Sequence, residues 1–146
     1  MKVILRQAKS SDLEWLAPFY EALMRPIVEL THAWDDNLFR EKFEPEFTSI
    51  IQLGRENIGM LKVQPLDDHL FLGDIQIAAE HQRKGIGSAL VEDILISARQ
   101  AGLPVRLKVL QGNSAAGFYE RFGFREIREL DNCVEMEWQD DSHSRR

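Results

Sequence analysis

The chain of 146 residues contains a single cysteine, few histidines and no long apolar run. With Cys133 alone, neither an intramolecular disulfide nor a cysteine-based metal cluster can form. The four histidines (His32, His69, His81 and His143) lack the paired spacing of metal ligands, so we expect no metal and place His81 at an exposed turn. No segment approaches the roughly 20 apolar residues of a membrane span, which predicts a cytoplasmic protein without membrane contact.

Positive charge is also scarce, because 18 Lys and Arg residues face 24 Asp and Glu residues and leave a net charge of −6. Nucleic-acid backbones reward basic surfaces, so this balance argues against a nucleic-acid partner. The length suits one domain, and no repeat and no linker rich in Pro, Gly or Ser divides the chain. We expect one domain over residues 1–139 and a polar tail over 140–146.

Hydrophobic periodicity predicts an α/β chain of mixed topology. Ser11 and Glu14 have the spacing of a capping box, Tyr20 falls on the apolar face of the helix that follows, and Pro26 should end that helix near Arg25. Meandering strands pair antiparallel, whereas strands joined through a helix require parallel pairing. Strands are expected over 2–7, 48–53, 57–65, 69–78, 104–110, 124–130 and 133–138, and helices over 11–25, 38–43, 87–101 and 114–122.

Residues 82–87, Gln-Arg-Lys-Gly-Ile-Gly, form a glycine-rich turn between a predicted strand and a predicted helix. Glycines let backbone N–H groups approach an anion at the positive end of a helix, which indicates a phosphate site. A dinucleotide-binding fingerprint would need glycine at Leu90, and a P-loop would need Lys84 to follow Gly85 rather than precede it. Neither motif is present, and a turn that merely begins the helix is the local alternative.

This Q-x-x-G-x-G turn and a second segment together resemble the GNAT superfamily of N-acetyltransferases. The second segment is "GNSAAGFYERFGF", residues 112–124, in which an Asn precedes a helix with an aromatic-Tyr pair before Gly-Phe. The resemblance covers nearly the whole chain. It implies the acyl-CoA N-acyltransferase fold, a mixed and mostly antiparallel sheet with a splayed parallel strand pair, flanked by about four helices. It also implies an acetyl-CoA-dependent N-acetyltransferase.

The resemblance further implies how acetyl-CoA is bound. Backbone N–H groups of residues 83–88 would hold the pyrophosphate, and the pantetheine arm would pair with the strand edge near residues 75–77, where an N–H would polarise the thioester oxygen. Arg83 and Lys84 contact phosphate or are solvated surface charges. Asn113 hydrogen-bonds the arm or caps the next helix. The implied cofactor-binding residues are Ile75, Ile77, Gln82, Arg83, Lys84, Gly85, Ile86, Gly87, Ser88 and Asn113.

Acetyl transfer to an amine needs a base for the ammonium group and an acid for the leaving thiolate. Tyr119 occupies the motif position of the acid, and its hydroxyl keeps its proton at neutral pH; a core residue is the alternative. Asp74 and Gln76 share one face of a predicted strand, and Asp74, which can ionise, is the candidate base or a solvent-facing carboxylate. Cys133 is remote from both motifs, which favours direct transfer within a ternary complex.

Residues 24–47 correspond to the stretch that walls the acceptor pocket in the family. Carboxylates in this stretch would attract a cationic amine, and the aromatic face of Trp34 could bind the ammonium group. The alternative is a solvated acidic surface with Trp34 in the core. We expect a small-molecule or protein amine as acceptor, and a homodimer through the late strands is common in the family. A noncatalytic acetyl-CoA sensor is the second function left open. The candidate acceptor residues are Glu29, His32, Trp34, Asp35 and Gln76.

Overall fold

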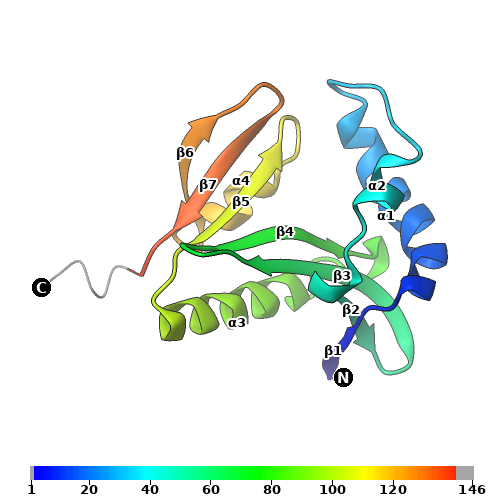
Figure 1. The fold of residues 1–146 in the computed structure, drawn as a ribbon, viewed down its shortest axis with the longest axis horizontal. Coiled ribbons are helices and arrows are strands. Elements are labelled where there is room, and N and C mark those ends of the chain that lie inside the picture. The colour runs from blue at the N-terminus through cyan, green and yellow to red at the C-terminus, as the bar shows by residue number, and fades with distance from the viewer. Residues whose placement is uncertain (1, 141–146) are drawn as a thin grey trace, which may run out of the picture. The chain divides into compact units, whose positions relative to one another are not determined.

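The computed structural model describes residues 2–140, and its elements follow the predicted order (Figure 1). The hydrogen-bonded strand order is β1-β2-β3-β4-β5-β7-β6, mostly antiparallel, with β4 and β5 parallel. This confirms the predicted fold class. The strands are β1 (Val3–Gln7), β2 (Thr48–Leu53), β3 (Glu56–Pro65), β4 (Leu70–Ile77), β5 (Val105–Leu110), β6 (Arg125–Glu129) and β7 (Cys133–Trp138), and the helices are α1 (Leu13–Val28), α2 (Leu38–Lys42), α3 (Ile86–Ala101) and α4 (Ala115–Glu120).

The chain folds into two compact units that interleave along the sequence. The first comprises the residues up to Val63 together with Asp74–Gly87, and the second comprises Gln64–Gly73 and the chain from Ser88 on. Strand β4 contributes its second half to the first unit and its first half to the second. The single domain over 1–139 stays a prediction. Of the predicted tail, Asp140 pairs with Arg99 at 3.4 Å, and residues 141–146 lie outside the described part of the chain.

In the first unit, β1, β2 and β3 pair antiparallel, with a register shift between Ile51 and Gln52. Apolar residues of α1 and of the strands alternate toward a common interior, as the period of each element requires. Their burial against each other holds α1 on the sheet. The buried cluster consists of Ala8, Leu16, Ile50 and Met60, with Trp15, Phe19, Tyr20, Phe39 and Phe43 packed around it.

The beginning and the end of α1 differ from the prediction. Asp12, rather than a Ser11–Glu14 capping box, organises the start: its carboxylate accepts bonds from both terminal nitrogens of Arg6, at 2.9 and 3.0 Å, and from the backbone of Lys9 at 2.8 Å. These partners lower the pKa of Asp12 to about 2. The helix also runs past Pro26 to Val28, because a proline near a helix end removes only one intrahelical hydrogen bond.

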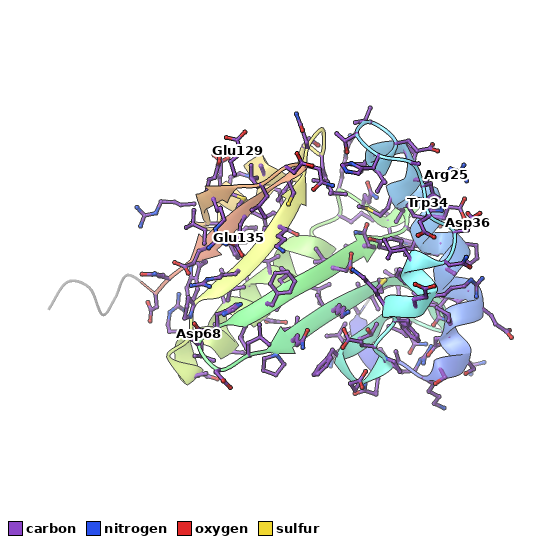
Figure 2. The ribbon with its side chains drawn as sticks, turned by 45° about the horizontal axis from the view of Figure 1, so that its top comes forward. Arg25, Trp34, Asp36, Asp68, Glu129 and Glu135 are labelled. Atoms are coloured by element: carbon purple, nitrogen blue, oxygen red, sulfur yellow. The ribbon has the colours of Figure 1, made fainter. Side chains whose placement is uncertain are left out.

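In the second unit, β5 pairs antiparallel with β7, and β7 with β6. One face of this sheet is apolar: Val105, Leu107 and Val109 are buried on β5, opposite Trp138, Met136 and Val134. The other face carries charge, with Arg106 bound to Glu137 at 2.7 Å and Arg128 paired with Glu135 at 3.6 Å (Figure 2 labels Glu135). The buried side of α3 is formed by Leu90, Val91, Ile94, Leu95 and Ala98.

Candidate functional site

The glycine turn leads from the end of β4 into α3. Arg83 and Gly85 have φ angles of +64° and +83°, which places both in the left-handed region. Left-handed residues within a turn aim successive N–H groups into a concavity that suits an anion. The first N–H groups of α3 add further donors without intrahelical acceptors and the positive end of the helix. A Cβ on Gly85 would meet no atom within 4 Å, so the space beside the turn is open.

One edge of β4 is free for pairing in the first unit. The backbone N–H of Ala78 donates to the carbonyl oxygen of Ile58 on β3 at 2.8 Å, and a Cβ on Gly59 would clash with the carbonyl oxygen of Gln76. Residues 76 and 78 therefore face β3, and Ile75 and Ile77 direct their backbone groups to the opposite side. Among residues 2–63 and 74–87 of the first unit, no other strand lies there.

The parallel pairing of β4 with β5 is short. It joins Leu70–Leu72 to Val105–Leu107, although β4 continues to Ile77 and β5 to Leu110. The residues of β4 that follow Leu72 are outside this ladder. An extended ligand with amide groups can therefore bind along Ile75 and Ile77 in the manner of an added strand.

Asp74 and Gln76 share one face of β4, as the sequence predicts. Nε2 of Gln76 lies 3.4 Å from Oδ1 of Asp74. Burial raises the pKa of Asp74 to about 6, while the hydrogen bond from Gln76 and the charge of Lys62 oppose this rise. Lys62 is itself held by Oε1 of Glu44 at 2.7 Å. A carboxylate with a pKa close to neutral pH is suited to act as a general base.

Aromatic side chains from α1, α2 and the segment between them form a cluster, and one member, Tyr20, is close enough to Asp74 to feel its charge. Tyr20 stacks on Phe39 with ring centroids 4.3 Å apart, and Trp34 lies 6.3 Å from Tyr20. Burial and the nearby charge of Asp74 raise the pKa of Tyr20, so its hydroxyl stays protonated. Figure 2 shows Trp34 beside α1, and its buried Nε1–H has no hydrogen-bond acceptor among residues 2–140. A buried donor without a partner is unusual and suits a bound acceptor atom.

The other predicted acceptor residues are exposed and engaged locally. Glu29 pairs with Arg25 at 3.1 Å within α1, and Nδ1 of His32 lies 3.0 Å from the hydroxyl of Thr31. Oδ1 of Asp35 accepts the backbone N–H of Asn37 at 2.9 Å. None of these bonds reaches Asp74 or Gln76. The structure thus groups Trp34 with Tyr20, and Tyr20 with Asp74, but gives no such link for Glu29, His32 or Asp35.

The second unit carries the downstream motif at the start of α4. Oδ1 of Asn113 accepts the backbone N–H of Ala115 at 3.0 Å, so Asn113 caps this helix, and its carboxamide NH₂ group can still donate elsewhere. Tyr119 is 8% exposed and packs edge-on against Phe118 and Phe124, with centroids 5.1 and 5.5 Å away. Both alternatives for Tyr119, core residue and acid, are compatible with this packing.

Comparison with known families decides the assignment. Residues 12–124 match the model of the acetyltransferase (GNAT) family, which includes both motifs. The chain belongs to the GNAT acetyltransferase family. A search of curated protein sequences gave no significant match.

Solved structures share the fold of this GNAT acetyltransferase at low sequence identity. The PaiA N-acetyltransferase of Thermoplasma acidophilum, in complex with coenzyme A, superposes with a TM-score of 0.78 at 19% identity, over 96% of this chain and all of the other. Naa50 of Arabidopsis thaliana, bound to a bisubstrate analogue of CoA and a peptide, gives 0.69 at 18%, over 96% and 100%. The ribosomal-protein-S18-alanine N-acetyltransferase of Escherichia coli gives 0.66 at 20%, over 94% of each chain.

Two features of the acetyltransferase were not predicted. His81 is only 13% exposed, contrary to the expected exposed turn, because its Nε2 lies 3.2 Å from Oε1 of Glu56. Glu80 joins them, and the three side chains could approach one cation. The sequence places Tyr20 on the apolar face of the first helix, but its proximity to Asp74 depends on tertiary packing that periodicity does not report.

Within the described residues, none of the helices combines the length and the hydropathy that crossing a bilayer requires.

Proposed function

We propose that this GNAT acetyltransferase moves the acetyl group of acetyl-CoA directly to a primary amine. The observation that carries the proposal is the arrangement within the first unit: a turn with left-handed Arg83 and Gly85 follows the free edge of β4. The turn suits a pyrophosphate, and the strand edge suits a chain with two amides. A single extended molecule that has both groups fits this combination.

Asp74 is the proposed base. The amine must lose a proton before its nitrogen attacks the thioester carbon, and a carboxylate with a pKa of about 6 is ionised at neutral pH while remaining a competent acceptor. It acts directly or through one water. As the new C–N bond forms and the C–S bond breaks, a backbone N–H at the edge of β4, near Ile75 or Ile77, stabilises charge on the carbonyl oxygen.

Tyr119 is the proposed acid, which returns a proton to the leaving thiolate. Its motif position supports this role, and so does a phenol group that is protonated at neutral pH. Cys133 lies half-buried on β7, where it pairs with Leu110, and the proposal gives it no covalent role. The acetyl group therefore passes from sulfur to nitrogen without an acetylated enzyme.

The acceptor is a cationic amine that binds near Trp34, Tyr20 and Asp74. The face of an aromatic ring and a carboxylate together attract an ammonium group. Both a peptide amine and a small molecule fit this description. Naa50 and the ribosomal-protein-S18-alanine N-acetyltransferase, two of the structural neighbours, support a peptide amine through their shared fold alone.

We place the enzyme in the cytoplasm, in keeping with its single cysteine. Strand β6, exposed along its whole length, is the element we propose for a homodimer.

Release of free thiol from acetyl-CoA, measured over a panel of small amines and peptides, tests the proposal. Turnover with at least one class of amine, and formation of the N-acetyl product by mass spectrometry, is the expected result. Calorimetry should show acetyl-CoA binding to the protein alone. Tight binding without turnover on any amine would instead support the noncatalytic sensor, and absence of binding would refute both functions.

A further inference from the structure

We propose that Gln82 is a positioning residue, which couples the phosphate-binding turn to the free edge of β4 through its side chain. Its Nε2 donates a hydrogen bond to the carbonyl oxygen of Ile77 at 2.8 Å. The inference rests on the proposed function, because the turn and the edge are taken there as the two halves of the acetyl-CoA site. It assigns the glutamine of the Q-x-x-G-x-G turn to the protein rather than to the phosphate.

Hydrogen bonds hold the connection between β4 and the turn up to Gln82. A short 3₁₀ segment, Ala79–His81, follows β4, with backbone bonds from His81 to Ala78 and from Gln82 to Ala79. The side chain of His81 also reaches Glu56 on β3. Residues 83–85 are exposed, and Arg83 adopts a left-handed conformation that costs free energy for a residue with a side chain. The side chain of Gln82 therefore joins the first residue of the turn to the end of β4.

The same bond limits how a ligand can pair with β4. The carbonyl oxygen of Ile77 is already used by Gln82, which leaves the N–H of Ile77 and both backbone groups of Ile75 on that edge. These remaining groups have no partner on β3 and are the ones we expect an arm with amide groups to pair with. The side chain of Gln82 binds the carbonyl oxygen of Ile77 and belongs to the turn. The distance between the groups that pair with the arm and the groups that bind phosphate is therefore set before acetyl-CoA binds. Such preorganisation lowers the entropic cost of ordering the turn on binding.

The kinetic test uses Gln82→Met, which keeps the length of the side chain and its zero charge but removes the donor. A hydrogen bond of this kind is worth a modest net amount, so we expect the KM for acetyl-CoA to rise about fivefold. The kcat at saturating acetyl-CoA and the KM of the acceptor should stay within twofold. S-acetylpantetheine, which lacks the pyrophosphate, should be used with unchanged kcat/KM. An equal loss with both donors would overturn the coupling.

Backbone nitrogen-15 relaxation on the ligand-free protein separates a hydrogen bond to Ile77 from a direct contact with phosphate. In Gln82→Met we expect the order parameters of the amides of residues 83–88 to fall below about 0.6, since the turn loses its anchor. A glutamine that serves only to touch phosphate would leave these order parameters unchanged in the free protein, and that result would refute the proposal.

The matched control is Gln7→Met. Gln7 is also exposed, lies in the same unit and donates its Nε2 to the carbonyl oxygen of Pro45 at 2.6 Å. Its replacement should alter neither the order parameters of residues 83–88 nor the KM for acetyl-CoA, and equal effects of the two variants would overturn the assignment of Gln82. The relaxation measurement needs no cofactor, so it tests the hydrogen bond to Ile77 even if the wild-type protein fails to bind acetyl-CoA and the proposed function falls.

Discussion

Asp74 accepts a hydrogen bond from Gln76 two residues along β4, with 3.4 Å between Oδ1 and Nε2. The bond stabilises the ionised carboxylate, yet the pKa of Asp74 is raised to about 6, so the cost of burial is the larger effect. The charge of Lys62 acts in the same direction as Gln76 and is partly engaged by Glu44. The balance leaves a carboxylate that titrates just below neutral pH.

The rate profile should report this titration. In the wild-type enzyme, kcat/KM should rise with pH through an apparent pKa near 6, because Asp74 must lose its proton to act as base. Asp74→Asn should lower the rate roughly 10²- to 10⁴-fold and remove this rise of kcat/KM with pH. Lys62→Met should shift the rise to higher pH, because it removes a positive charge that lowers the pKa of Asp74. A rise with an apparent pKa near 6 that persists in Asp74→Asn would assign the base elsewhere.

The same carboxylate should cost stability at neutral pH. Its pKa rises from 3.8 to about 6 on folding, so the folded state binds more protons between these values and the free energy of unfolding falls as pH increases through this window. Asp74→Asn removes this charge. It should therefore stabilise the protein by up to about 3 kcal/mol at pH 7.5, less to the extent that water reaches the carboxylate, and by little at pH 3.5. Denaturant titrations at both pH values check this, and equal effects at the two pH values would contradict it.

Tyr119→Phe should lose roughly 10²- to 10⁴-fold in turnover and keep its affinity for acetyl-CoA. The ring packs against Phe118 and Phe124, and phenylalanine preserves that packing. Single-turnover kinetics, together with binding by calorimetry, separate the chemical step from cofactor affinity. If turnover is unchanged under conditions where chemistry limits the rate, Tyr119 serves as a core residue of α4.

Gly87→Glu should abolish measurable affinity for acetyl-CoA, because it places bulk and negative charge in the first turn of α3, where the pyrophosphate is proposed to bind. Gln100→Glu is the matched control, since Gln100 is exposed near the other end of the same helix and the change adds the same charge. This control should bind as the wild type does. Wild-type affinity in a folded Gly87→Glu protein would refute the phosphate role of the turn.

The sequence predicted the order of strands and helices because each element has its own periodicity and its own turn residues. It also placed Asp74 and Gln76 on one face, since positions two apart on a strand must share it. The grouping of Tyr20 with Asp74 and Trp34, and of His81 with Glu56, joins residues far apart in the chain. Such contacts depend on how α1 and the strands pack, which no local pattern encodes.

The start of α1 shows the same limit at short range. Ser11 and Glu14 have the spacing of a capping box, but Asp12 is favoured because it can bind Arg6 on β1 as well as the backbone of Lys9. An interaction with the neighbouring strand thus overrides the local motif. The hydrogen bond of Gln82 is also absent from the local pattern: its position in the motif indicates cofactor binding, whereas its side chain donates to the carbonyl oxygen of Ile77 at the end of β4.

Trp34 provides the sharpest test of the acceptor site. It contributes an aromatic face next to Tyr20 and a buried N–H without an acceptor among the described residues. Trp34→Ala should raise the KM of the acceptor about tenfold, within the range of a partly desolvated cation–π contact, and leave the KM for acetyl-CoA unchanged. Trp34→Phe keeps the aromatic face and loses the donor, so a smaller rise is expected. Asp35→Ala, a neighbour whose carboxylate is engaged by Asn37, should have the least effect. Equal acceptor kinetics in wild type and Trp34→Ala would place the acceptor site away from this aromatic cluster.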